Sequence, residues 1–136
     1  MYNKLMKNKK IGKITRPSNI KPEPHEIKTA EFFANRGHNI EFLEPSWTKG
    51  SKTPDIQMDG LLWEIKVPQG NSKRTIENNY RIAEKQAQNI IFDLRRLPID
   101  ETKAISQIRQ QFYLRRRNTL RLLIITKSGQ LLDIKR

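Results

Sequence analysis

Apolar positions recur every three or four residues in three segments of the chain, which predicts three amphipathic helices. The first helix is expected from Pro24 to about Arg36, with Gly37 as its C-cap. The second is expected from about Ser72 to Gln88. The third should begin after Asp100, a good N-cap residue, and end in the arginine run at 115–117.

Between and after these helices, alternating or continuously apolar residues predict strands. The expected strands are Asn39–Glu44, two strands of a hairpin across Thr53–Val67, then Asn89–Leu94, Leu120–Thr126 and Leu131–Ile134. Continuously apolar strands are typical of a sheet that is covered on both faces. The order αβββαβαββ therefore predicts an α/β (α+β) fold with a mixed sheet flanked by helices.

The hairpin carries the first candidate chemistry. Asp59-Gly60 is a strong two-residue turn signal, because a type I′ turn needs positive φ at both central positions. With that turn, Asp55 faces Glu64 across the two strands, and Lys66 shares their face. Facing residues have Cβ atoms roughly 4.5–5.5 Å apart, so two carboxylates repel unless a cation lies between them. Such an oxygen-rich pocket suits Mg²⁺ or Mn²⁺, whereas the alternative is an exposed hairpin with surface charges.

A further carboxylate falls on the apolar face of the first predicted helix. Glu26 lies within the stripe that includes Ala30 and Phe33, where a carboxylate is costly unless it is paired or bound to metal. The alternative is that Glu26 is a first-turn acid that interacts favourably with the helix dipole. Glu31, at the edge of the stripe, is the alternate candidate.

Composition points to a polyanionic partner. The 136 residues fit one domain, and the formal net charge is +13 with a pI of about 10.3, which favours nucleic acid as the ligand. The alternatives are an anionic membrane surface or a merely soluble basic protein, but no segment has the character of a basic amphipathic membrane helix.

The absence of cysteine excludes disulfides and thiolate metal sites. No apolar run reaches the roughly 20 residues of a membrane span, and the N-terminus lacks the apolar segment of a secretory signal.

Basic residues concentrate in three places. Residues 1–22 contain seven Lys or Arg and no acid, which predicts a mobile basic arm preceding a single domain over residues 23–136. This arm would either contact phosphates or serve as a solubilising tail. Nucleic-acid contacts are also expected from the loop before the hairpin and from the second helix, through Lys49, Lys52, Lys73, Arg74, Arg81 and Lys85. In that loop Trp47 could stack on a base or anchor packing.

His25 and His38 are the two histidines, and their spacing is poor for a shared metal. This spacing also disfavours a metal-free ribonuclease that uses two histidines.

The pair Pro54-Asp55 followed by Glu64-Ile65-Lys66 resembles the PD-(D/E)xK nuclease signature. From Glu26 to the end, the chain is similar to the C-terminal tRNA nuclease domain of CdiA-type contact-dependent inhibition toxins. The shared features include the helix ending at Gly37, the segment Lys52-Thr53-Pro54-Asp55, Gly60, Glu64-Ile65-Lys66, Gln86-Ala87 and the late strand–turn–strand. The resemblance implies the PD-(D/E)xK core and metal-dependent phosphodiester cleavage, with tRNA as the usual substrate.

The resemblance also implies roles for the residues. Asp55, Glu64 and Glu26 would bind a divalent metal, Mg or Mn with Zn as the alternative, together with the Ile65 carbonyl. Lys66 would orient the attacking water, stabilise the transition state, or act as a base if a 2′-hydroxyl is the nucleophile. An acidic immunity protein is the expected protein partner, and action in the cytoplasm of a target cell after delivery is implied.

Two other classes of function fit the same residues. One is a DNA-acting PD-(D/E)xK enzyme, such as a junction resolvase or a restriction-type endonuclease. The other is a non-catalytic nucleic-acid-binding module, against which the intact set Asp55, Glu64 and Lys66 argues.

Overall fold

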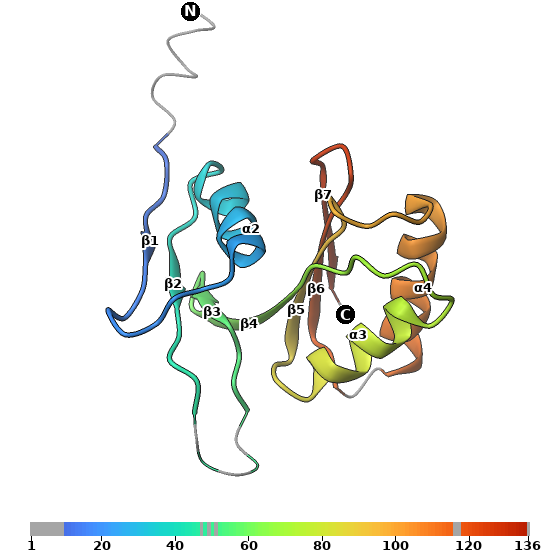
Figure 1. Ribbon diagram of the computed structural model, residues 1–136, viewed down its shortest axis with the longest axis horizontal. Coiled ribbons are helices and arrows are strands. Elements are labelled where there is room, and N and C mark those ends of the chain that lie inside the picture. The colour runs from blue at the N-terminus through green and yellow to red at the C-terminus, as the bar shows by residue number, and fades with distance from the viewer. Residues whose placement is uncertain (1–9, 47, 49, 51, 116–117, 136) are drawn as a thin grey trace, which may run out of the picture.

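Seven strands form one mixed sheet whose spatial order follows the chain (Figure 1). The computed structural model describes residues 10–46, 48, 50, 52–115 and 118–135. Its elements are, in order, β1 (Ile14–Thr15), α2 (Pro24–Ala34), β2 (Ile40–Phe42), β3 (Ile56–Met58), β4 (Leu61–Lys66), α3 (Thr75–Glu84), β5 (Asn89–Asp93), α4 (Glu101–Leu114), β6 (Arg121–Ile125) and β7 (Leu131–Lys135). The predicted α+β class and the order αβββαβαββ are confirmed, with one additional strand, β1, at the start.

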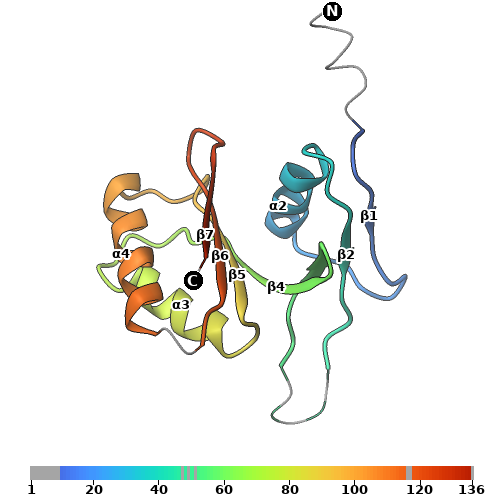
Figure 2. The same cartoon turned by 180° about the vertical axis from the view of Figure 1, so that it is seen from behind.

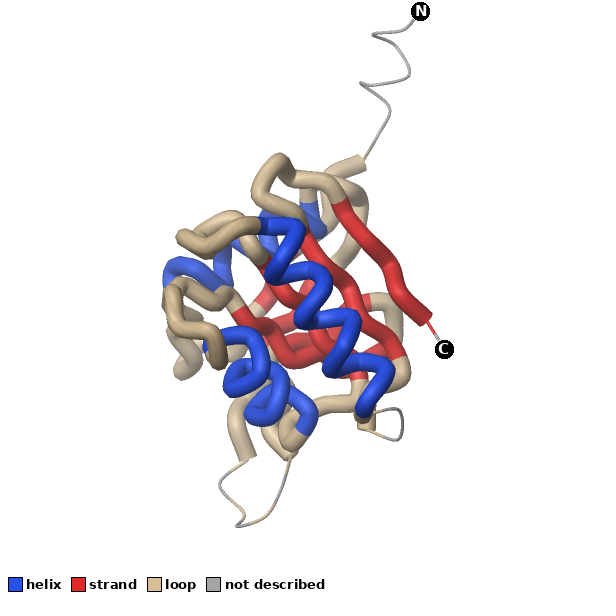
Figure 3. Tube along the Cα trace, turned by 90° about the vertical axis from the view of Figure 1, so that its right-hand side faces the viewer, coloured by secondary structure: helices blue, strands red, loops and turns tan. Residues whose placement is uncertain are grey.

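The central strands are parallel and the outer hairpins antiparallel. Strands β4, β5 and β6 run parallel to one another, whereas β2–β3, β3–β4 and β6–β7 are antiparallel and β1 pairs in parallel with β2. The sheet bends strongly at β4, so that α2 lies between its two halves (Figures 1 and 2). Helices α3 and α4 cover the other face (Figure 3).

Alternating side chains of β5 divide the core into two clusters. Ile91 packs with the apolar face of α2 and with Trp63 and Ile65 of β4, while Ile90 and Phe92 pack with α3 and α4. Every residue of β5 is buried, as its continuous apolar sequence predicted. None of the helices in the described part of the chain has the length and hydrophobicity that a membrane crossing requires.

The structure departs from the predicted arm between residues 12 and 15. The amide of Gly12 donates to the carbonyl of Ala34 at 2.7 Å, and the amide of Ile40 donates to the carbonyl of Lys13 at 2.8 Å. Strand β1 is therefore tied to both α2 and β2. Both of its residues are exposed, so backbone hydrogen bonds rather than a buried apolar face hold it in place, and hydrophobic periodicity gives no signal for it. Residues 1–9 lie outside the described residues.

Candidate carboxylate site

The predicted hairpin is present and sets the position of the site. Asp59 and Gly60 have φ angles of 55° and 75°, and Met58 pairs with Leu61 across the turn. The regular ladder extends to Ile56, which pairs with Trp63. Asp55 directly precedes Ile56, and Glu64 directly follows Trp63 on β4. The turn therefore brings the two carboxylates near each other.

Two backbone hydrogen bonds and one side-chain hydrogen bond fix Asp55. Its amide donates to the carbonyl of Trp63 at 2.9 Å, so the ladder shifts by one residue and Asp55 lies outside β3. Its carbonyl accepts from the amide of Leu43, and its Oδ2 accepts from the amide of Ile65 at 2.7 Å. The last bond turns the Asp55 carboxylate towards β4, where Glu64 is located.

Glu64 is a buried carboxylate with one unsatisfied oxygen. The residue is 6% exposed, and its Oε1 receives no hydrogen bond from the described part of the chain. Its Oε2 lies 3.5 Å from Nζ of Lys66. Because leaving a buried charged oxygen unpaired is expensive, this atom indicates a position that a proton or a cation would stabilise.

The electrostatics of the pair favour a bound proton. Burial, and after it the negative charge of Asp55, raise the pKa of Glu64 to about 9 against the opposing effect of Lys66. Burial also raises the pKa of Asp55, although the hydrogen bond from Ile65 opposes this. A proton on Glu64 forms a hydrogen bond to Asp55, so at neutral pH the two carboxylates share one negative charge.

Glu26 lies near this pair, and one of its carboxylate oxygens accepts a hydrogen bond at the start of α2. Its Oε1 accepts a hydrogen bond of 2.9 Å from the amide of Glu23 and completes a capping box at the start of α2. Burial raises its pKa, and the charge of Asp55 adds to this effect. Thus Glu26 lies in the first turn of α2, where its alternative role as a helix-dipole acid placed it, and it remains within electrostatic reach of Asp55. Glu31 is exposed on α2.

The donor set determines what the site could hold. Within residues 10–46, 48, 50, 52–115 and 118–135, no group of three or more His, Cys, Asp or Glu side chains is arranged to hold a metal ion. The site instead offers the two carboxylates of Asp55 and Glu64, with the free Oε1 of Glu64 as the available oxygen. Oxygen donors of this kind fit hard cations such as Mg²⁺ or Mn²⁺, whose remaining positions are commonly filled by water and substrate phosphate.

A supporting residue, Gln86, holds the segment that leads to Asp55. Its Oε1 accepts hydrogen bonds from both the amide and the hydroxyl of Thr53, at 2.9 and 2.6 Å. Gln86 follows α3, so this contact joins the α3–β5 loop to the start of the hairpin. The sequence contains no physical signal for this contact, because a lone glutamine after a helix is usually a solvent-exposed residue.

The sequence of this site matches a known family. Residues 52–131 match the family described as the contact-dependent growth inhibition CdiA C-terminal domain. The chain belongs to the CdiA C-terminal domain family. The matched segment contains Asp55, Glu64, Lys66 and Gln86, whereas Glu26 precedes it. No curated protein matches the chain.

The fold of this CdiA C-terminal domain also has a solved counterpart. It is similar to a chain of the CdiA-CT/CdiI toxin and immunity complex from Burkholderia pseudomallei, with a TM-score of 0.62 and 18% identity. The similarity covers 90% of this chain and 99% of that chain. At this identity the likeness establishes the fold, and it extends over nearly all of both chains.

The predicted nucleic-acid contacts remain predictions, and the described ones differ in their surroundings. Lys52 is exposed and lines a cavity of about 370 Å³ with Leu61, Leu62 and Gln86. On α3 and just before and after it, Arg81, Lys73 and Lys85 are exposed, and Arg74 pairs with Glu77 at 2.7 Å. Lys49 and Trp47 lie outside the described residues.

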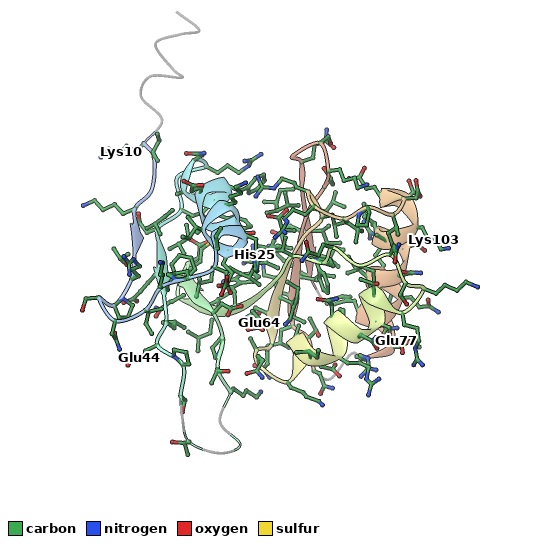
Figure 4. All side chains as sticks on the ribbon, viewed as in Figure 1. Lys10, His25, Glu44, Glu64, Glu77 and Lys103 are labelled. Carbon is green, nitrogen blue, oxygen red and sulfur yellow. The ribbon has the colours of Figure 1, made fainter. Side chains whose placement is uncertain are left out.

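The two histidines have different neighbours. His38 pairs with Asp59 at 3.0 Å beside the hairpin turn. His25 instead lines a cavity at the start of α2 and is labelled near the middle of the molecule in Figure 4, above Glu64.

Proposed function

We propose that this CdiA C-terminal domain is a metal-dependent nuclease with a PD-(D/E)xK core, and that it acts as a tRNA-cleaving toxin. The observation that carries the proposal is the pair of buried Glu64 and partly buried Asp55, with an unsatisfied oxygen on Glu64 and with Lys66 beside it. A surface hairpin has no need to place a buried carboxylate beside a second one, whereas metal-dependent phosphodiester hydrolysis requires oxygens that hold a cation.

Each residue has a distinct task in this proposal. Asp55 and Glu64 would hold the divalent cation, Mg²⁺ or Mn²⁺ in preference to Zn²⁺, with Glu26 acting through its charge on Asp55. A bound cation of this type would lower the pKa of a water and neutralise charge on the scissile phosphate. The ammonium of Lys66 would donate a hydrogen bond to the attacking oxygen or to the phosphate as its negative charge grows.

The substrate and the protein partner follow from charge and family. A net charge of +13 favours a polyanion, and the CdiA-type resemblance favours tRNA among polyanions. The solved relative is a complex of a toxin with an immunity protein. We therefore propose an acidic immunity protein as the partner of this domain, and the cytoplasm of a target cell as its place of action.

The direct test is cleavage with matched carboxylate variants. Purified protein is incubated with tRNA and with duplex DNA, in Mg²⁺ or Mn²⁺ and in chelator. Cleavage of tRNA is expected only with the cation, and Glu64→Gln should lose it. Glu41→Gln, which removes an exposed carboxylate on β2, should cleave as wild type. Cleavage in chelator would overturn the metal dependence, and cleavage of duplex DNA alone would favour the DNA-acting class.

A further inference from the structure

A cavity rich in basic side chains lies beside the end of β4. Its volume is about 200 Å³, and its lining residues are His25, Lys28, Val67, Asp93, Arg95 and Arg96. A second cavity of about 330 Å³ shares His25, Lys28 and Arg96 with it. None of these basic residues was among the nucleic-acid contacts expected from the sequence.

A hydrogen-bond network holds the floor of this cavity in place. Asp93, which is 2% exposed, accepts hydrogen bonds from Thr29 Oγ1 at 2.7 Å and from Arg95 Nη2 at 2.7 Å. Arg95 Nη2 also donates to the carbonyl of Lys28 at 3.1 Å. The network ties the first turns of α2 to the end of β5, so Arg95 is oriented before any ligand arrives.

The cavity keeps an excess of positive charge. Its single carboxylate, Asp93, is neutralised by Arg95. Within the described part of the chain, neither Lys28 nor Arg96 forms an ion pair, and Arg96 donates to the neutral Gln69 at 2.7 Å. Two further carboxylates act on lining residues: Glu31, further along α2, on Arg95, and Glu26 on His25. Two cations therefore remain available to an anionic ligand.

The position of the cavity relative to the carboxylates follows from β4. Val67, which lines the cavity, directly follows Lys66, and Leu61 and Leu62 at the other end of β4 line the cavity of Lys52. An extended strand rises about 3.3 Å per residue, so Leu62 and Val67 lie at most about 17 Å apart. Glu64 lies between them. Val67 packs with the α2 side of the core, and the cavity adjoins the carboxylates through His25, whose charge acts on Glu26 beside Asp55.

We propose that the cavity of Lys28, Arg95 and Arg96 binds a backbone phosphate of the nucleic-acid substrate, on the side of the carboxylate site away from Lys52. This inference rests on the proposed nuclease function and names a binding site for it. Arg95 supplies a fixed guanidinium, and Lys28 and Arg96 supply charges that are not neutralised by the protein. A recess of this size suits a phosphate group better than the broad face of a partner protein.

The test compares two double variants that lose the same charge. Lys28→Ala with Arg96→Ala removes the free cations of the cavity, whereas Lys103→Ala with Arg109→Ala removes two exposed cations from α4, on the other side of the sheet (Figure 4). Binding of labelled tRNA is measured by fluorescence anisotropy from low to physiological salt. Chelator and the Glu64→Gln background prevent cleavage. The slope of log affinity against log salt should fall by about 0.7–0.9 for each phosphate that is no longer bound, in the cavity variant only.

Several outcomes would overturn the proposal. Equal slopes of log affinity against log salt for the two double variants would assign the effect to net charge. Failure of the parent protein to bind tRNA would show that tRNA is not the ligand. If the cavity variant binds tRNA normally but no longer binds an acidic partner protein, the cavity is part of a protein interface instead. Because binding is measured without cleavage, a protein that binds through the cavity but never cleaves would refute the nuclease function and leave the phosphate site standing.

Discussion

Nζ of Lys66 lies 3.5 Å from Oε2 of Glu64, two residues away on the same strand. The positive charge of Lys66 lowers the pKa of Glu64, yet burial and the charge of Asp55 outweigh it and raise that pKa to about 9. The ion pair is therefore incomplete at neutral pH, since Glu64 carries a proton. This relationship makes the stability of the metal-free protein and its affinity for metal depend on pH in opposite directions.

The metal-free protein should lose stability as pH rises. Between pH 4.5, the ordinary pKa of Glu64, and about pH 9, the folded state holds a proton that the unfolded state has released. The contribution to the free energy of unfolding is therefore complete below pH 4.5 and falls with increasing pH, by up to about 1.4 kcal/mol per pH unit. Denaturation in urea at pH 5 to 9, with chelator, measures this slope.

The variant Glu64→Gln isolates that contribution. Glutamine has no proton to lose, so the stability of the variant should depend less on pH, and above pH 7 the variant should be more stable than wild type. Glu41→Gln is the control, because it removes an exposed carboxylate of β2. Parallel pH profiles for wild type and Glu64→Gln would show that Glu64 ionises normally, and the assignment of an unsatisfied buried oxygen would be wrong.

Metal should stabilise the folded protein, and more strongly at higher pH. A ligand at 100 times its dissociation constant adds about 2.7 kcal/mol to the free energy of unfolding, and binding here must displace the proton of Glu64. Asp55→Ala should lose both the melting increment with Mg²⁺ or Mn²⁺ and cleavage. Lys66→Met should lose cleavage but keep the rise in melting temperature with cation. That rise should appear at higher pH than in wild type, because Lys66 no longer lowers the pKa of Glu64.

Differential scanning fluorimetry with and without cation, beside the cleavage assay, checks both variants. A wild-type protein whose melting temperature is the same in cation and chelator at pH 8 would contradict metal binding at this pair. An unchanged increment in Asp55→Ala would place the cation elsewhere on the chain.

The hairpin could be predicted from sequence because local chemistry determines it. Asp59 and Gly60 set the turn, and the turn sets the register as far as Ile56 and Trp63, the neighbours of Asp55 and Glu64. The one-residue shift of the ladder at Asp55 could not be predicted, since it depends on packing beyond the two strands. The buried oxygen of Glu64 also depends on what covers it, which alternation along a strand does not specify.

Polar interactions between distant segments could not be predicted either. Glu26 was recognised as a carboxylate on the buried side of a helix, but its capping bond to Glu23 depends on a rotamer. The bonds between Gln86 and Thr53 join residues 33 positions apart, and the bond between Asp93 and Thr29 joins residues 64 apart. Single-sequence patterns report local periodicity, so polar contacts of this range leave no trace in them.

Gln86 should act as a positioning residue for Asp55. Gln86→Ala leaves the amide and hydroxyl of Thr53 without their acceptor, which should lower stability by about 1–3 kcal/mol. A displacement of about 1 Å at a catalytic group can reduce rate about 100-fold, so kcat should fall more than KM rises. Gln88→Ala, which removes a nearby exposed glutamine, is the matched control.

The conservative variant separates positioning from stability. Gln86→Glu keeps an acceptor oxygen and should recover most of the metal-induced melting increment that Gln86→Ala loses. A merely structural role predicts a lower melting temperature with the same increment and the same kcat. That pattern would refute the positioning role of Gln86.

The docked N-terminal segment should contribute to stability through Gly12. A Cβ added at Gly12 would lie 1.7 Å from the carbonyl oxygen of His38, so Gly12→Ala must displace β1 from β2 or shift the backbone after α2. We expect a loss of about 1–3 kcal/mol, measured by denaturation in urea. Deletion of residues 1–21 should produce a similar loss, because it removes the bond from Gly12 to Ala34 and the pairing of Ile14 with Ile40.

A shorter deletion and a matched variant separate docking from charge. Deletion of residues 1–9 removes three lysines but leaves Gly12 and β1 in the chain, so stability should stay near wild type while tRNA binding weakens at low salt. Lys13→Ala removes one charge and keeps the backbone bond between Lys13 and Ile40, so it should also fold normally. Unchanged stability in both Gly12→Ala and the deletion of residues 1–21 would show that the segment adds nothing to the folded domain, and β1 would then be held too weakly to count as part of the sheet.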